Sequence, residues 1–221
     1  MVIIGQSEYV DDACLGGGGS SKVIPLYTVP PLDGMRDVLA DLGGSATVTK
    51  FTVADDLSNL SEARAAAAEA DVVVVMAGLV ATEGADQADM NMRNEQNRMV
   101  AELAVNPRTV VVLKDGNPVL MPWIDAVPAV IETWNQGSED GHAVADLLFG
   151  VVNPSGKLPT TYPRTSAPRA NTRPSRTSSP SPADGRVTRF DGEIGPGPAE
   201  LRFGTARRAL TVYRPPVRSF F

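Results

Sequence analysis

The sequence has few of the residues that form disulfides or bind metals. Its 221 residues include one cysteine, Cys14, and one histidine, His142. A single cysteine cannot form an intrachain disulfide, and this composition argues against a structural zinc site. A Ser-His-Asp triad would depend on His142, and no Gly-x-Ser-x-Gly elbow is present. We therefore expect neither a metal site nor a cofactor.

Long apolar runs and N-terminal targeting signals are also missing. No apolar stretch approaches the roughly 20 residues that a membrane-spanning helix needs. The opening Met-Val-Ile-Ile-Gly has neither a basic n-region nor a cleavage site, so we expect no signal peptide. No membrane partner is expected, and a cytoplasmic location is the default expectation.

Positive charge is scarce in most of the chain and dominates its end. The net charge is −6, but residues 1–163 carry 9 basic and 22 acidic groups, whereas residues 164–221 carry 11 arginines and 4 acidic groups. The second segment is rich in Pro, Ser, Thr and Arg and cannot bury much apolar surface. We therefore expect one domain over 1–163 and a linker-like or disordered tail over 164–221. A shifted reading frame in GC-rich DNA is an alternative origin of this tail.

The arginine-rich tail raises the question of nucleic-acid binding. Its arginines are not interleaved with aromatic residues, and they belong to no recognised nucleic-acid-binding fold. We therefore expect no nucleic-acid partner.

Strand-like and helix-like segments alternate through the first 163 residues. The apolar runs, such as the four valines at 72–75, are continuous, which is typical of strands covered on both faces. The pattern predicts an α/β fold: a three-layer sandwich with a mostly parallel sheet of at least five strands and helices on both faces. The expected strands are 2–5, 47–53, 71–78, 108–116 and 128–134. The expected helices are 31–43, 59–70, 94–105, 119–126 and 138–150.

Unusual loops follow four of the predicted strands. In open parallel sheets, ligands bind in the loops beyond the carboxyl ends of the strands, so these four loops belong on one edge. Trp134, at the end of its strand, either stacks on a sugar ring or fills the core. The loops contain GGGGSS at 16–21, the three acids Glu83, Asp86 and Asp89, the single acid Asp115, and the pair Glu139 and Asp140.

The tetraglycine segment lies between a strand and a helix, so it is not a terminal tether. Four glycines permit positive φ angles and close approach of the backbone to a ligand. A phosphate cradle is disfavoured because the Gly-Lys-Ser/Thr order and the GxGxxG pattern are both absent. The hydroxyls of Ser20 and Ser21 and the acidic neighbours favour a polar, neutral ligand. A flexible surface loop is the open alternative.

The acidic loop after the valine-rich strand is the second candidate site. A carboxyl group beside an apolar strand end can act as a general acid/base if burial raises its pKa. The alternative is that Glu83, Asp86 and Asp89 are solvated loop charges.

Five motifs resemble, in their order, the second domain of glycoside hydrolase family 3, the β-glucosidase family. The resemblance covers roughly residues 2–163, and a weaker resemblance is present at 184–195. The motifs are GGGGSSKVIPLYTVPPLDGMR, ADVVVVMAG with EGADQADM, TVVVLKDGNPVLMPWID, IETWNQGSEDGHAVADLLFG and VNPSGKLPTTYP.

The resemblance implies an α/β sandwich packed against a (β/α)8 barrel, with the glycine and acidic loops facing the barrel across a sugar pocket. It also implies retaining hydrolysis of a β-glucoside or oligosaccharide by two carboxyl groups about 5 Å apart. The nucleophile would lie on the barrel, and Glu83 is the nearest match to the acid/base. The predicted substrate-binding residues are Gly18, Gly19, Ser20, Ser21, Asp86 and Asp115.

The acidic loop departs from the family pattern at three places. This chain has Ala81-Thr82 where members often have acidic residues, Asp86-Gln87 where they usually have Asp-Arg, and Met92-Arg93-Asn94 where they usually have Leu-Pro-Gly.

The barrel and its nucleophile lie outside the 221 residues, which leaves two hypotheses open. The chain is a glycosidase module whose second carboxyl is Asp86, Asp115 or Asp12. Otherwise it is a non-catalytic sugar-binding remnant, or half of a split enzyme that a barrel partner completes. In the second case, we also expect self-association through the barrel-facing surface.

Overall fold

The computed structural model describes residues 1–20, 22–166 and 211–213. Most of the predicted tail over 164–221 therefore lies outside the described residues. Ser21 and the weaker family resemblance at 184–195 also lie outside the described residues.

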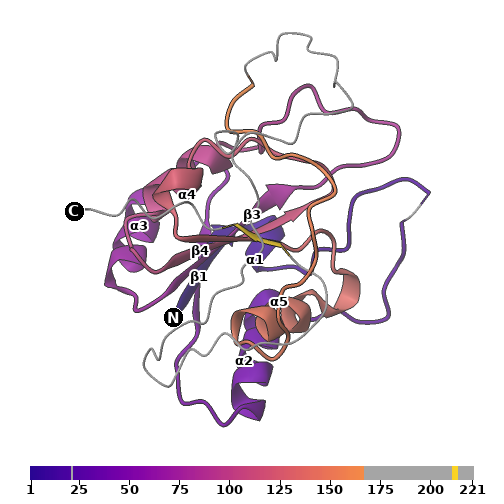
Figure 1. The fold of residues 1–221 in the computed structure, drawn as a ribbon. Helices are drawn as coiled ribbons and strands as arrows, with labels where there is room; N and C mark the ends of the chain where they lie inside the picture. The colour runs from indigo at the N-terminus through magenta and orange to yellow at the C-terminus, as the bar shows by residue number, and fades with distance from the viewer. Residues whose placement is uncertain (21, 167–210, 214–221) are drawn as a thin grey trace, which may run out of the picture.

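A single sheet forms the middle layer of the domain (Figure 1). Its strand order is β2-β1-β3-β4-β5-β6. The first five strands are parallel, as the sequence predicts, and β6 pairs antiparallel with β5 at one edge. No strand was expected from the sequence at the position of β6. The strands are β1 (Val2–Gln6), β2 (Thr49–Val53), β3 (Val73–Leu79), β4 (Thr109–Asp115), β5 (Ala129–Glu132) and β6 (Thr211–Tyr213).

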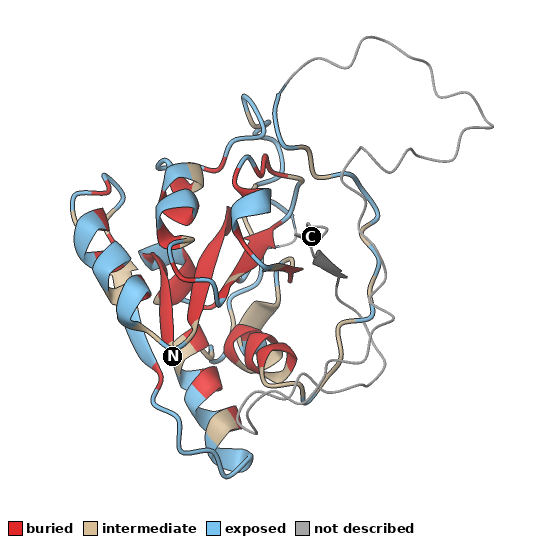
Figure 2. Cartoon of the chain, turned by 60° about the vertical axis from the view of Figure 1, so that its left-hand side comes forward, coloured by how far each residue is buried: buried red, intermediate tan, exposed pale blue. Residues whose placement is uncertain are grey.

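Helices cover both faces of the sheet, which confirms the predicted three-layer class. The short α1, α2 and α5 pack on one face, and α3 and α4 pack on the other (Figure 1). Figure 2 shows the strands buried and the outer helix surfaces exposed. The helices are α1 (Ser7–Val10), α2 (Pro31–Asp41), α3 (Leu60–Glu69), α4 (Gln96–Leu103) and α5 (Asp140–Leu148), with the 3₁₀ turns η1 (Ile124–Ala126) and η2 (Gly137–Glu139).

The valine-rich strand β3 explains why the apolar run is continuous. Val73 and Val75 belong to the core beneath α3 and α4, whereas Val74 and Met76 belong to the core beneath α2 and α5. Successive side chains of a strand point to opposite faces, so a strand covered on both faces needs apolar residues throughout.

Helix boundaries follow local signals in the sequence. Helix α2 begins at Pro31, where the missing proline N–H has no intrahelical partner to lose. It ends before Gly43, whose φ of 67° is the left-handed conformation that glycine favours. Asn59 precedes α3, but its side chain accepts the N–H of Ala54 and donates to the carbonyl of Thr52 instead of capping the helix.

The predicted helix over residues 119–126 is wrong for most of its length. Only the 3₁₀ turn η1 forms there. The backbone N–H of Leu120 donates to the carbonyl of Met90, and that of Met121 donates to the carbonyl of Pro163. These N–H groups bond to distant segments instead of to a helix. The stretch therefore joins the loop after β4 to the loops that contain Met90 and Pro163.

The strand order places a topological switch point between β1 and β3. The chain leaves β1 toward β2 and leaves β3 toward β4, which lie on opposite sides. Loops diverging from such a point leave a crevice at the carboxyl edge of the sheet. The glycine loop follows β1 and α1, and the acidic loop follows β3, so both candidate loops border this point. No helix in the described ranges is long and apolar enough to cross a membrane.

Candidate active-site loops at the carboxyl edge

The glycine loop packs directly against the acidic loop. A Cβ added to Gly17 would lie 1.4 Å from the carbonyl oxygen of Ala81. A Cβ added to Gly19 would lie 2.4 Å from Cβ of Glu83. Real Cβ atoms do not approach so closely, so glycine is required for this contact between the two backbones.

Gly18 takes part in the same contact, whereas a Cβ on Gly16 would lie nearest to Asn135, at 3.6 Å. A Cβ on Gly18 would lie 2.5 Å from Oγ1 of Thr82. Gly16 and Gly19 have φ angles of 86° and 92°, which disfavour other residues. The tetraglycine segment is thus a close-packed part of the domain in which two residues need left-handed conformations.

Glu83, the predicted acid/base, is exposed on the acidic loop. Its Oε2 accepts the backbone N–H of Ser20 at 2.6 Å. Hydrogen bonds from the Ser20 hydroxyl and then from its backbone N–H lower the pKa of Glu83 below its ordinary value. A carboxyl group with a lowered pKa is ionised at neutral pH. A general acid must instead carry a proton, which needs a raised pKa.

Asp86 lies on the wall of an open pocket of about 500 Å³. Asp86 and Asp89 are both exposed, and Asp89 accepts the backbone N–H of Asn91 at 2.7 Å. This pocket lies between the acidic loop and the loop after β4. It is lined by Leu79, Ala81, Thr82, Ala85, Asp86, Gln87, Asp89, Met90, Asn117 and Pro118.

Asp115, a predicted substrate-binding residue, is fully buried at the end of β4. The hydroxyl of Tyr162 lies 2.9 Å from Oδ1 of Asp115 and 2.9 Å from Oε2 of Glu132. A ligand would have to displace Tyr162 to reach Asp115. Glu132 and Tyr162 were not expected at the site from the sequence, although a glutamate at the end of an apolar strand is a signal of a buried carboxyl group.

These two carboxyl groups have strongly raised pKa values. Burial raises the pKa of Asp115 to about 7. Burial, and then the charge of Asp115, raises the pKa of Glu132 to about 9. One hydroxyl hydrogen of Tyr162 cannot be donated to two carboxylates at once. The cluster therefore holds a further proton at neutral pH.

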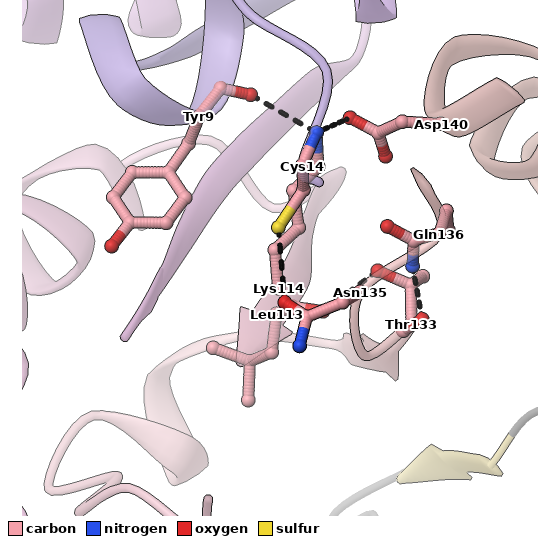
Figure 3. Close-up of polar contacts among 8 residues, drawn as sticks. All are labelled: Tyr9, Cys14, Leu113, Lys114, Thr133, Asn135, Gln136 and Asp140. Atoms are coloured by element: carbon pink, nitrogen blue, oxygen red, sulfur yellow. Dashed lines mark hydrogen bonds and ion pairs between the residues drawn. The ribbon is translucent and has the colours of Figure 1, made fainter. Parts of the chain in front are cut away.

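A buried ion pair fixes the base of the glycine loop (Figure 3). Nζ of Lys114 lies 2.5 Å from Oδ2 of Asp140 and 3.1 Å from the carbonyl oxygen of Tyr9. The same Oδ2 accepts the backbone N–H of Cys14 at 3.0 Å, and the thiol of Cys14 lies 3.2 Å from Oδ1 of Asn135. The loops after β1 and β5 and the end of β4 are thus joined by one charged cluster.

Trp134 and His142 also lie around this edge. Trp134 is half-buried with a φ of 56°, and its ring meets that of Tyr162 edge-on at 6.5 Å. His142 is partly exposed on α5 between Glu139 and Asp37, and the hydrogen bond to Glu139 raises its pKa.

Asp12 is exposed after α1. No group of three or more His, Cys, Asp or Glu side chains suited to a metal ion occurs in the described part of the chain.

Comparison with known proteins identifies the family. The profile of the glycosyl hydrolase family 3 C-terminal domain matches residues 1–195. The chain belongs to glycosyl hydrolase family 3. This confirms the resemblance carried by the five motifs, and the match extends past residue 163 into the segment assigned to the tail.

Sequence relatives in the family are β-glucosidases of much greater length. The chain is 40% identical over 158 residues to thermostable beta-glucosidase B of Acetivibrio thermocellus, covering 66% of this chain and 20% of that protein. It is 35% identical over 167 residues to a beta-glucosidase of Rhizobium radiobacter, covering 72% of this chain and 19% of that protein. The chain thus spans about a fifth of the length of these relatives.

Solved structures of the family share the fold. A GH3 beta-glucosidase of Bifidobacterium adolescentis matches with a TM-score of 0.61 and 30% identity, over 74% of this chain and 24% of that chain. DesR, a beta-glucosidase of Streptomyces venezuelae solved with D-glucose, matches with a TM-score of 0.66 and 22% identity, over 74% of this chain and 34% of that chain.

Proposed function

We propose that this chain supplies the acid/base half of a β-glucosidase-type glycoside hydrolase, with Glu83 as the acid/base. Membership of the family and the β-glucosidase names of its relatives support the reaction class, hydrolysis of an O-glycosyl bond in a β-glucoside or oligosaccharide. The position of Glu83 beside the topological switch point supports its role, because ligands of parallel sheets bind there.

In the retaining mechanism, two carboxyl groups about 5 Å apart share the work. A nucleophile from a barrel domain attacks the anomeric carbon while Glu83 gives its proton to the leaving-group oxygen. Glu83 then removes a proton from the water that releases the sugar. The loop backbone at Gly18 and Gly19, the Ser20 hydroxyl and the Asp86 carboxylate are proposed to contact the sugar. Asp115 would contribute indirectly, by accepting the hydrogen bond that holds Tyr162 in place.

The exposure of Glu83 is the observation that carries the half-enzyme proposal. In this chain the carboxylate is open to water, and its hydrogen bonds to Ser20 lower its pKa. A general acid needs the opposite shift, which burial against another surface supplies. The barrel domain is the proposed source of that surface as well as of the nucleophile.

An apolar segment beside the same loops supports such a partner. Val23, Ile24, Leu26 and Tyr27 are 73%, 87%, 102% and 60% exposed. The C-terminal end of this segment is held by a hydrogen bond, because the N–H of Val29 donates to the carbonyl of Ser138 at 2.8 Å. Contiguous exposed apolar side chains mark interaction surfaces, and we propose that the barrel covers this one.

The alternative function is that of a non-catalytic sugar-binding remnant. The polar pocket bordered by Asp86 favours it, because carboxylates accept hydrogen bonds from sugar hydroxyls. In this alternative Glu83 contributes to affinity and not to bond cleavage.

The purified chain should be assayed for release of p-nitrophenol from p-nitrophenyl β-glucoside. The half-enzyme proposal predicts no turnover above a mock purification, since the nucleophile is on the partner. Turnover that is lost in Glu83→Gln and kept in Glu69→Gln, an exposed glutamate on α3, would show that this chain assembles its own carboxylate pair. Turnover unchanged in both variants would exclude Glu83 as its source.

A further inference from the structure

We propose that the glycine-rich loop is a positioning element for Glu83, in which Ser20 holds the carboxylate and the glycines let the two backbones meet. The catalytic meaning of this role rests on the proposed function of Glu83. The positioning itself does not, because it concerns contacts within this chain.

The contact is directed at one oxygen of the carboxylate. The N–H of Ser20 donates to Oε2 of Glu83 at 2.6 Å. A Cβ on Gly19 would lie 2.8 Å from the same oxygen, so any other residue at 19 would displace the carboxylate. A charge-assisted hydrogen bond of this kind fixes the orientation of the Glu83 carboxylate relative to the glycine loop.

The loop that carries Ser20 is itself fixed at its base. Cys14 donates its backbone N–H to the buried carboxylate of Asp140 at 3.0 Å, and its carbonyl accepts the N–H of Gly137 at 2.9 Å. Gly17 then packs against the carbonyl of Ala81. Ser20 therefore stands on backbone that is held at two points on its N-terminal side.

Three glycines of the loop pack against the loop that carries Glu83. Here Gly17, Gly18 and Gly19 approach residues 81–83 more closely than a Cβ would allow. Contact with the Glu83 loop thus accounts for Gly17, Gly18 and Gly19, whereas Gly16 lies beside Asn135.

A carboxyl ¹³C NMR titration of the full chain tests this inference. Glu83→Gln identifies the Glu83 signal. In Ser20→Ala, loss of the hydroxyl bond should raise the midpoint of Glu83 toward its ordinary value of 4.5, and Ser20→Thr should restore the low midpoint. Gly19→Ala should raise the midpoint further, because the added Cβ displaces the carboxylate from the Ser20 N–H.

Gly43→Ala is the matched control. Gly43 also has a left-handed φ, of 67°, but an added Cβ there meets nothing within 4 Å, so the Glu83 midpoint should stay unchanged. Midpoints in Ser20→Ala and Gly19→Ala equal to that of the unmodified chain would overturn the inference. Failure of the proposed function is a separate result, because it would appear as activity independent of Glu83 and leave these midpoints unaffected.

Discussion

The ammonium of Lys114 and the carboxylate of Asp140 lie 2.5 Å apart, and both side chains are fully buried. The pair joins the end of β4 to the first residue of α5, and Asp140 also binds the backbone of Cys14 beneath the glycine loop (Figure 3). Removing one partner of a buried pair leaves the other charge without compensation, which is costly.

Lys114→Met should therefore lower the free energy of unfolding by about 3–5 kcal/mol. The reason is that the buried carboxyl group of Asp140 would lose its charge partner and, within the described residues, keep only the hydrogen bond from the backbone N–H of Cys14. Urea unfolding followed by circular dichroism measures the change. Arg64→Met breaks a half-exposed pair with Glu102 and should cost about 1 kcal/mol or less. Equal costs for the two variants would contradict the structural role given to Lys114.

The Asp115–Glu132 cluster should make the domain less stable as pH rises. Both groups have raised pKa values in the folded state, about 7 and about 9, so between pH 5 and 9 the folded state binds more protons than the unfolded state. Their stabilising effect is complete below the unfolded pKa values and is lost as pH rises through the folded ones.

Glu132→Gln should flatten this pH dependence. A glutamine amide donates a hydrogen bond as the protonated acid does but does not titrate, so stability near pH 9 should rise relative to the unmodified chain. Thermal unfolding midpoints at pH 5, 7 and 9 measure the effect. A variant whose midpoints fall with pH as steeply as those of the unmodified chain would contradict the further proton that is assigned to the Asp115–Glu132 cluster.

Helices α2 and α5 should not tolerate a side chain at Gly34. An added Cβ would lie 2.1 Å from the backbone carbon of Gly141 on α5, so the helices would have to separate. Gly34→Ala should cost about 1–3 kcal/mol, as overpacking does, despite the better helix propensity of alanine. Asp41→Ala, at an exposed position of the same helix, should change stability by no more than about 0.5 kcal/mol. Denaturant unfolding of both variants measures the two costs, and equal costs would contradict the close packing of α2 on α5.

The sequence predicted the sheet and most of its helices because those patterns are local. Continuous apolar runs marked the strands, and the helix-like segments between them marked α2, α3, α4 and α5. Helix α1 has four residues, too few for any periodicity to appear. The stretch at 119–126 failed because its backbone bonds to Met90 and Pro163, contacts that no local pattern encodes.

The location of the candidate site could be predicted from the sequence, but most of its side-chain contacts could not. Strand order and loop position bring Gly19 and Glu83 to one edge, although 64 residues separate them. The pairings of Lys114 with Asp140 and of Tyr162 with Asp115 depend on tertiary packing, so the sequence showed only single charged residues next to apolar strands.

The central claim, that Glu83 is the acid/base of a glycosidase pocket, is tested most directly in a chimera. Residues 1–166 would replace the matched region of the A. thermocellus enzyme, and hydrolysis of p-nitrophenyl β-glucoside would be measured with and without sodium azide. The account predicts that Glu83→Ala lowers turnover by roughly 10²–10⁴-fold, the usual contribution of acid–base catalysis. It also predicts that azide restores turnover, because azide attacks the glycosyl-enzyme without a base. Glu69→Ala should leave turnover unchanged. A folded chimera that is inactive with Glu83 intact, or whose turnover is unaffected by Glu83→Ala, would contradict the account.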